Sequence, residues 1–482
     1  MATLRKVAQN SFLYTISSVL LRASSIIFFP IFSLYLTKSD YGILSITQSI
    51  GTFVTLFAGL ELGKALTRFI FNESEKENSD HSSLIFTTLI TSFAFGLIVV
   101  AFLSLSGPYI LKPILNDIPF YPYVFLFLLS IPLNTSVNTC RVYLKANHRG
   151  YHAFILDTAF FSINILLNLF FVVIMGMDVL GIILGVLLNT TLFSLLLYFL
   201  FYRKYTFDFD KKILKSTLNY AIPLLPYSVL NILFESVDKF FLNAYLGSQA
   251  SGIYYIALTF AAIFSSAKEA IINAFTPWLF ANIREKPEKE IAKIISLIFA
   301  GAGFVAIGIS WFSRELLTLL SSNPDFIVAY QYIPFTVIGL YIIFMGQLYN
   351  IKTFYYGKYN RYLFLATLAG IVADVIACYL LIKPYGIYGA VAARIIAFSV
   401  HVVVIVYLSN KEADKRNIYN TKLIIGTLLL ACSVSLLPVV DDQTLTFTVL
   451  KLFFYMLMSV GFLFILNRKM NIVSLFLRKK KE

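Results

Sequence analysis

Residues 10–45 read NSFLYTISSVLLRASSIIFFPIFSLYLTKSDYGILS and begin with an apolar run that contains one basic residue, Arg22, near its middle. The run extends over 11–36, which is longer than the ~20 predominantly apolar residues that a helix needs to cross a bilayer. A short polar turn leads directly into a second apolar run at 42–69. Two such runs joined by a few polar residues predict a pair of membrane-spanning helices.

The same pattern continues along the chain. Fourteen apolar stretches are long enough to span a membrane, and we number them as spans 1 to 14. They cover 11–36, 42–69, 83–106, 121–146, 153–176, 180–201, 218–246, 252–282, 293–312, 333–356, 363–383, 387–409, 422–439 and 447–466. Hydrophobic residues make up 59% and charged residues 13% of the 482 residues, which excludes a soluble globular protein. The predicted fold class is an all-α polytopic membrane protein with 14 transmembrane helices.

Positive charges are distributed unevenly between alternate loops. When both termini are placed in the cytoplasm, 30 of the 39 Lys and Arg residues fall on that side and five on the other, which is the bias expected of cytoplasmic loops. The net charge of +14 therefore reflects orientation in the membrane and not a nucleic-acid-binding surface. The three cysteines form no CxxC pair and have no nearby His cluster, so we expect neither a disulfide framework nor a metal site.

An internal repeat with a period of about 210 residues runs through the chain. The turn between spans 1 and 2 reads LTKSDYGIL and the turn between spans 7 and 8 reads LGSQASGIY, so that Gly42 matches Gly252. In the same way VLGIILG before span 6 and IYGAVAA before span 12 match through Gly181 and Gly389. Because an even number of spans separates the copies, we predict two parallel six-helix halves, with spans 13 and 14 outside the repeat.

The 6 plus 6 plus 2 arrangement, the opening stretch and the glycine turn YGIYGAVAARI resemble a known family. It is the polysaccharide-transport branch of the multidrug/oligosaccharidyl-lipid/polysaccharide exporter (MOP) superfamily, which includes the O-antigen flippases. The resemblance implies a V-shaped alternating-access transporter with lobes at 1–208 and 209–415 and a C-terminal segment at 416–482. It also implies the bacterial cytoplasmic membrane and an undecaprenyl-diphosphate-linked oligosaccharide that moves from the inner to the outer leaflet.

Several ionisable side chains lie inside spans 1, 2, 7 and 8, which line much of the cavity in this family. A charge at the centre of a membrane helix costs roughly 2.5–3.5 kcal/mol, so we expect these residues to face a polar interior. Glu235 and Asp238 are candidate proton or ion carriers. The predicted substrate-binding residues are Arg22, Glu61, Asp238, Lys239, Lys268 and Glu269. The basic members of this set, Arg22, Lys239 and Lys268, would bind the diphosphate through their positive charges.

Local pairing offers a second interpretation of some of these charges. Arg22 and Glu61 lie at similar depths on neighbouring spans and are a candidate ion pair. Glu235, Asp238 and Lys239 share one face of the predicted helix, and the i, i+4 pair of Glu235 with Lys239 would neutralise itself.

Three further charges are interpreted as structural. Asp374 in span 11 and Arg394 in span 12 lie about equally far from the turn near Tyr385, which predicts a structural ion pair. Asp157 in span 5 is expected to pair with Arg149 or His148.

The function that these features favour is a flippase. No GxxxxGK[ST] motif is present, so we expect no ATP hydrolysis and no cofactor. The outer loops are too short to hold a catalytic domain, which argues against an enzyme of glycan assembly. The alternative is a cation-coupled multidrug or small-molecule antiporter of the same superfamily, a branch in which carboxylates dominate the cavity. Expected partners are the polyprenyl-diphosphate-linked glycan and membrane lipids, with a polysaccharide polymerase and chain-length machinery as further candidates and no nucleic acid.

Overall fold

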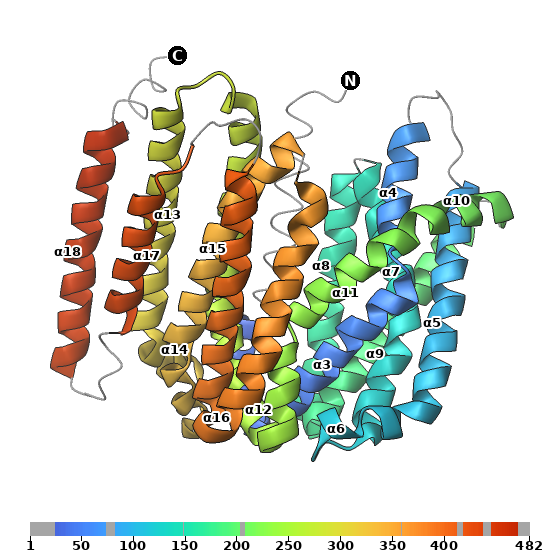
Figure 1. Cartoon of the computed structure of the whole chain (residues 1–482). Helices are drawn as coiled ribbons and strands as arrows, with labels where there is room; N and C mark the ends of the chain where they lie inside the picture. The colour runs from blue at the N-terminus through green and yellow to red at the C-terminus, as the bar shows by residue number, and fades with distance from the viewer. Residues whose placement is uncertain are drawn as a thin grey trace. The chain divides into compact units, whose positions relative to one another are not determined.

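The computed structural model describes residues 25–73, 82–147, 149–202, 208–357, 359–411, 418–436 and 445–470. Within these ranges every regular element is helical (Figure 1), and ten helices are long and apolar enough to cross a membrane. Two of them, α12 (Val237–Asn282) and α16 (Leu363–Asn410), contain two spans each, because Gly247 and Gly386 turn the chain with φ of 76° and 60°. The prediction of an all-α polytopic membrane protein is confirmed.

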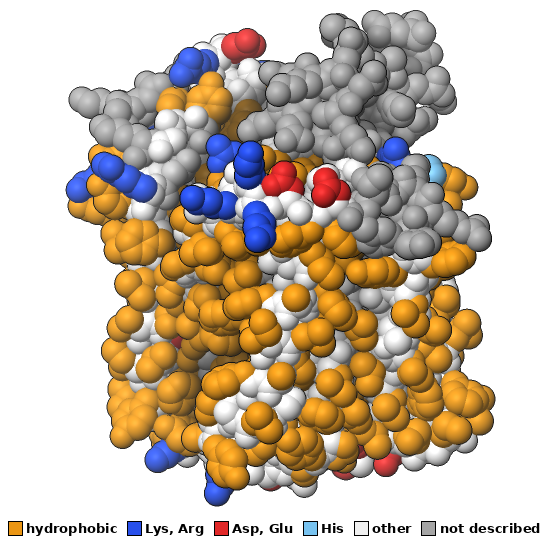
Figure 2. Space-filling model, turned by 90° about the vertical axis from the view of Figure 1, so that its right-hand side faces the viewer, with side chains coloured by type: hydrophobic (Ala, Val, Ile, Leu, Met, Phe, Trp, Pro, Cys, Tyr) orange, Lys and Arg blue, Asp and Glu red, His pale blue; other side chains and the backbone are white. Residues whose placement is uncertain are grey.

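Hydrophobic side chains cover the middle of the face shown in Figure 2, whereas Lys, Arg, Asp and Glu lie toward its two ends. Leu105, Ile174 and Leu195 are large apolar side chains that are 81%, 74% and 64% exposed. Apolar exposure of this extent is unfavourable in water and is expected where a helix bundle contacts lipid.

The contacts within the chain define two compact units. The first unit comprises Met1–Thr259, Leu320–Ala329 and Thr367–Ala397. At its centre α7 packs against α3, α5 and α9. Besides parts of α12 and α16, its helices are α2 (Phe29–Tyr35), α3 (Lys38–Gly59), α4 (Leu62–Glu73), α5 (Ser82–Ile110), α6 (Lys112–Leu115), η1 (Phe120–Val124), α7 (Phe125–Ala146), α8 (Gly150–Leu169), η2 (Phe170–Ile174), α9 (Asp178–Tyr202), α10 (Lys211–Ala221), η3 (Ile222–Leu224), α11 (Leu225–Phe234) and most of η4 (Pro324–Gln331).

The second unit comprises Phe260–Leu319, Tyr330–Ala366 and Phe398–Glu482. Besides the remaining parts of α12 and α16, its helices are α13 (Glu288–Trp311), α14 (Ser313–Leu320), α15 (Ile333–Tyr356), η5 (Asn360–Tyr362), α17 (Thr421–Leu436) and α18 (Leu445–Met470). The ring of Tyr341 stacks on that of Phe299 with centroids 4.4 Å apart, and Trp311 Nε1 donates to the carbonyl of Val434 at 2.7 Å. Helices α17 and α18, which correspond to spans 13 and 14, both pack against α13.

The matched turns of the repeat contact each other inside the first unit. A Cβ atom placed on Gly42 would lie 1.9 Å from the carbonyl oxygen of Ser248, and one on Gly252 would lie 1.7 Å from that of Lys38. Lys38 and Ser248 are themselves 210 residues apart (248 − 38), so the two contacts are equivalent under the repeat. Reciprocal contacts of this kind are what an approximate twofold axis produces.

A second pair of turns has the same spacing. Gly176 and Gly386 both adopt left-handed backbone, with φ of 65° and 60°, and they are 210 residues apart (386 − 176). Glycine adopts this conformation without the steric cost that a Cβ atom imposes. The internal repeat therefore extends from sequence to backbone geometry.

The expected partner of Asp157 was wrong. Arg141 Nε of α7 donates to Asp157 Oδ1 at 2.7 Å, and Lys145 Nζ lies 3.9 Å from Oδ2. Asp157 lies on α8, which packs against α7, so the neighbouring helix supplies the partner and not the preceding loop. Arg149 is exposed, and His148 lies outside the described residues.

Candidate functional site

Span 7 is divided into α11 and α12 by a turn at Glu235 and Ser236. The backbone N–H groups of Glu235 and Ser236 donate to Ile232 and Leu233 at 3.2 and 2.9 Å, three residues back, which tightens the end of α11. The predicted single stripe is therefore interrupted, because the turn separates Glu235 from Asp238. Glu235 is exposed, whereas Asp238 is only 1% exposed.

A polar cavity of about 390 Å³ lies beside this turn, between α3 and the α11–α12 segment. Its polar lining consists of Ser45, Gln48, Ser49 and Thr52 from α3 and Asn231, Glu235, Ser236, Lys239 and Tyr255 from the facing segment. Tyr255 OH donates to Gln48 Oε1 at 3.0 Å, which joins the two walls. Glu235 and Lys239 therefore give the lining of this cavity one acidic and one basic side chain. It lies within the first compact unit.

A buried charge cluster lies next to this cavity. Arg394 Nη1 donates to Asp238 Oδ2 at 2.7 Å, and Tyr254 OH donates to the same oxygen. Asp374 is 1% exposed, and its Oδ1 accepts a hydrogen bond from Cys378 Sγ at 3.5 Å. It also interacts electrostatically with Asp238 and Arg394. The guanidinium of Arg394 thus interacts with two buried carboxyl groups, those of Asp238 and Asp374.

This cluster bears on two of the expectations from the sequence. Asp238 was expected to line the substrate cavity, but its burial and its bond to Arg394 direct the carboxylate into the protein interior. Arg394 was expected to pair with Asp374. Its guanidinium bonds to Asp238 at 2.7 Å, and it also interacts electrostatically with Asp374, so Asp238 is an additional partner. The sequence argument rested on equal depth, and depth does not give the direction in which a side chain points.

A second break interrupts span 2. Helix α3 ends at Gly59 and α4 begins at Leu62, while Leu60 and Glu61 between them have left-handed backbone with φ of 47° and 56°. Residues other than glycine pay roughly 1–3 kcal/mol for such conformations, which are common at functional sites. Lys64 Nζ donates to Glu61 Oε1 at 3.0 Å and to Ser228 Oγ of α11 at 3.1 Å.

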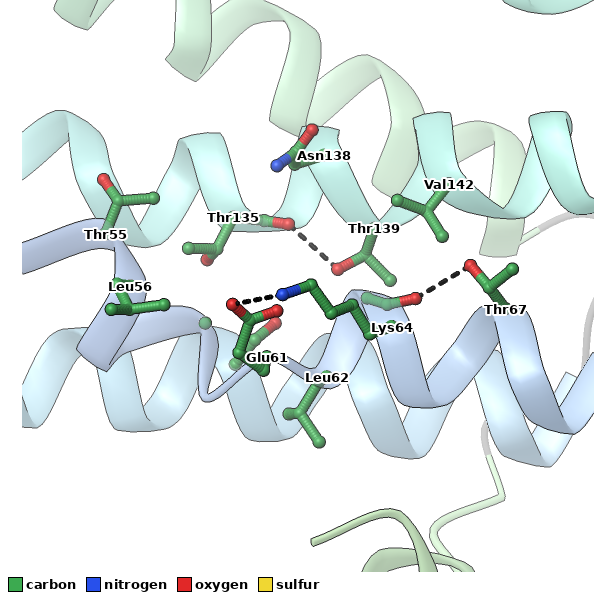
Figure 3. Close-up of a pocket in the computed structure, with 13 residues that line it drawn as sticks. Thr55, Leu56, Glu61, Leu62, Lys64, Thr67, Thr135, Asn138, Thr139 and Val142 are labelled. Carbon is green, nitrogen blue, oxygen red and sulfur yellow. Dashed lines mark hydrogen bonds and ion pairs between the residues drawn. The ribbon is translucent and has the colours of Figure 1, made fainter. Parts of the chain in front are cut away.

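This break forms one wall of a second cavity of about 360 Å³, which Figure 3 shows in close-up. Glu61 and Lys64 face Thr135, Asn138 and Thr139 of α7 across it (Figure 3). Lys64, which lies in span 2, lines this cavity but was not among the predicted site residues. Its spacing of three residues from Glu61 was the available signal.

One face of α3 connects the two cavities. Gln48 and Thr52 line the first cavity, and Thr55 and Gly59 line the second. These positions are three or four residues apart and so lie along one side of the helix. A polar stripe on a membrane helix faces protein or water and not lipid, so the stripe marks a continuous polar surface inside the first unit.

The remaining predicted site residues lie elsewhere. Lys268 belongs to the second unit, where it is 7% exposed and its Nζ donates to Gln347 Oε1 of α15 at 3.3 Å. Glu269 is half-buried beside it. Arg22, and with it the candidate Arg22–Glu61 pair, lies outside the described residues. Among the residues that the structure describes, no group of three His, Cys, Asp or Glu side chains could hold a metal ion.

Residues 7–283, more than half of the chain, match the profile of a family described as polysaccharide biosynthesis proteins. The comparison with curated proteins gave no significant match.

Solved structures of transporters share the fold. The lipid II flippase MurJ in an inward closed conformation has a TM-score of 0.68 at 14% identity, over 96% of this chain and 99% of that chain. A variant of the MATE transporter VcmN from Vibrio cholerae has a TM-score of 0.61 at 14% identity, over 86% and 98% of the two chains. An inward-facing multidrug resistance MATE transporter of the MOP superfamily has a TM-score of 0.62 at 16% identity, over 81% and 94%. The expected superfamily fold is confirmed.

Proposed function

Because the chain belongs to the polysaccharide biosynthesis protein family and is a membrane transporter and not an enzyme, we propose that it is a flippase for lipid-linked oligosaccharides. Its substrate is an undecaprenyl-diphosphate-linked repeat unit of O-antigen, capsule or exopolysaccharide. Transport runs from the inner to the outer leaflet of the bacterial cytoplasmic membrane by alternating access. MurJ, which shares the fold over 96% of this chain, is described as a lipid II flippase, and this likeness supports the proposal.

The observation that carries the proposal is the polar surface along α3, with a cavity at each end of the stripe. A glycan head group needs hydrogen-bonding partners throughout its passage, while its polyprenyl tail is soluble in lipid. Lys239 supplies a cation to the first cavity. In this proposal Lys239 binds the diphosphate in that cavity and Glu61 binds sugar hydroxyls in the second one. Arg22, Lys268 and Glu269 remain proposed substrate-binding residues, each considered by itself.

The buried cluster changes which residue could couple transport to a proton. Asp238 Oδ2 accepts hydrogen bonds from the Arg394 guanidinium and the Tyr254 hydroxyl, which direct this carboxylate into the protein interior. Glu235 lines the first cavity and is exposed. We therefore assign the coupling role to Glu235 and a structural role to Asp238. In this proposal the lobes at 1–208 and 209–415 move against each other, and 416–482 stands outside the moving pair.

Deleting the gene tests the function. We expect loss of surface polysaccharide and accumulation of lipid-linked repeat units, with restoration by the wild-type chain. Lys239→Ala should reduce restoration on the order of tenfold, because a hydrogen bond from a charged group is worth about 1.5–3 kcal/mol. Lys289→Ala, at an exposed lysine of α13, is the matched control and should restore fully.

The second candidate function is a cation-coupled antiporter, which the shared fold of the two MATE transporters favours. In that case deletion would leave the surface polysaccharide intact and raise the sensitivity to drugs. A polysaccharide polymerase and its chain-length machinery are expected as partners only if the protein is a flippase.

The orientation is tested separately by thiol labelling. We propose that both termini are cytoplasmic, because 30 of the 39 Lys and Arg residues then lie on that side. In a chain whose three native cysteines are replaced by alanine, Lys112→Cys should react with a membrane-impermeant reagent in spheroplasts. Lys289→Cys should react only after permeabilisation. Both lysines are exposed, so the reverse pattern would invert the orientation.

A further inference from the structure

The second cavity has an unusual hydrogen-bonding character, because five of its hydroxyl groups already donate their proton within their own helix. They are Thr55 to Gly51 at 2.7 Å, Thr67 to Gly63 at 3.0 Å, Ser92 to Leu89 at 3.0 Å, Thr135 to Pro132 at 2.7 Å and Thr139 to Thr135 at 2.9 Å. A hydroxyl has one proton and two acceptor lone pairs. What each of these groups offers to a ligand is therefore its lone pairs.

The charged groups reinforce this acceptor character. Glu61 adds carboxylate oxygens, and the ammonium group of Lys64 is bonded to one of them at 3.0 Å. The amide of Asn138 and the remaining protons of Lys64 are the side-chain donors. The pair is neutral overall, so the cavity contains no surplus cation.

This composition discriminates between the two chemical parts of the transported head group. A diphosphate brings negative charge and acceptors, and would meet lone pairs and a carboxylate. A sugar ring brings several O–H donors as well as acceptors, and meets complementary partners on α3, α4 and α7 (Figure 3). The volume of about 360 Å³ lies within the range of about 300–1,000 Å³ that is typical of small-ligand sites.

We infer that the cavity at the α3–α4 break is a subsite for an uncharged, hydroxyl-rich sugar ring of the glycan, and that the diphosphate binds outside it. The inference rests on the proposed flippase function and assigns specificity to Glu61, Thr135 and Thr139. Thr135 and Thr139 are one turn apart on α7, so their lone pairs can accept from two hydroxyls of one ring.

The test uses the purified full-length protein in detergent and saturation-transfer NMR with a panel of uncharged hexoses and N-acetylhexosamines. At least one uncharged sugar should bind, glucuronate should bind more weakly, and pyrophosphate should not displace the sugar. The double variant Thr135→Val, Thr139→Val loses two acceptors and should bind on the order of tenfold more weakly.

Thr190→Val is the matched control. Thr190 Oγ1 donates to Val186 of its own helix at 2.9 Å in the same way, but it does not line the cavity, so this variant should bind as the wild type does. Asn138→Ala, at an exposed position, gives a second measurement if the double variant fails to fold. The inference is wrong if no uncharged sugar binds, if pyrophosphate displaces it, or if the folded cavity variants bind as the wild type does.

The sugar subsite and the proposed flippase function can be disproved independently of each other. If deletion leaves surface polysaccharide intact while sugar binding depends on the two threonines, the flippase function is wrong and the sugar site stands. If deletion abolishes surface polysaccharide while the threonine variants bind and export normally, the function stands and the subsite is wrong.

Discussion

Arg394→Leu is expected to destabilise the purified protein by about 3–5 kcal/mol, the range for breaking a buried ion pair by removal of one partner. The guanidinium bonds to Asp238 at 2.7 Å and also interacts with Asp374. Its removal leaves two carboxylates, each 1% exposed, without that cation. Thermal unfolding in detergent, followed by the loss of monodisperse protein, measures the effect.

The cluster also predicts an order of effects. Asp238→Asn should be milder than Arg394→Leu, because Asp374 remains to compensate the guanidinium and the amide still accepts a hydrogen bond. In the Arg394→Leu background, Asp238→Asn should restore part of the lost stability, since it removes one of the stranded charges. Arg149→Leu, at an exposed arginine, is the control and should change little. If the second substitution lowers stability further, the charges are not coupled as the structure indicates.

The sequence predicted what depends on local composition and on the repeat. Apolar length located the spans, and the match of Gly42 with Gly252 predicted two turns that the structure brings into contact. The match of Gly181 with Gly389 located the neighbouring turns at Gly176 and Gly386. These features follow from hydrophobicity and from the steric freedom of glycine, which a sequence states directly.

The two helix breaks at the candidate site could not be predicted in this way. Glu235 and Ser236 lie in ILFESVDK, which contains neither proline nor glycine, and the helical period continues across them. Leu60 and Glu61 follow Gly59, but a single glycine is also compatible with an unbroken membrane helix. Next to this break, Lys64 bonds to Ser228 on α11, 164 residues away, a contact that no local pattern predicts.

The partners of buried charges were predicted less well for a related reason. Counting residues from a turn gives the depth of a side chain in the bundle but not its direction around the helix. Asp374 and Arg394 were expected at similar depths, and this gave no sign that Arg394 bonds to Asp238 of α12. Asp157 similarly bonds to Arg141 across α7 and α8. Which helices are neighbours is a property of the fold.

Gly252→Ala is expected to destabilise the protein, although alanine favours a helix over glycine by roughly 1 kcal/mol. The new Cβ atom would lie 1.7 Å from the carbonyl oxygen of Lys38 and 3.0 Å from the backbone nitrogen of Gly42. Both neighbours are backbone atoms, so α3 and α12 must move apart. Overpacking of this kind typically costs 1–3 kcal/mol, and it would strain the hydrogen bond between Ser39 Oγ and Ser248 Oγ, which is 2.6 Å long.

Whether a Gly→Ala substitution stabilises or destabilises the protein shows which factor dominates at that glycine, helix propensity or steric overlap with a neighbouring helix. A Cβ atom placed on Gly426 of α17 would meet no neighbouring atom of the described residues within 4 Å, so Gly426→Ala should be neutral or stabilising in the same unfolding assay. Gly42→Ala should resemble Gly252→Ala, because its Cβ would lie 1.9 Å from the carbonyl oxygen of Ser248. Equal and unfavourable effects at the two glycines support a reciprocal contact between the repeats. A stabilising effect at either one would show that the turns do not approach as closely as the structure places them.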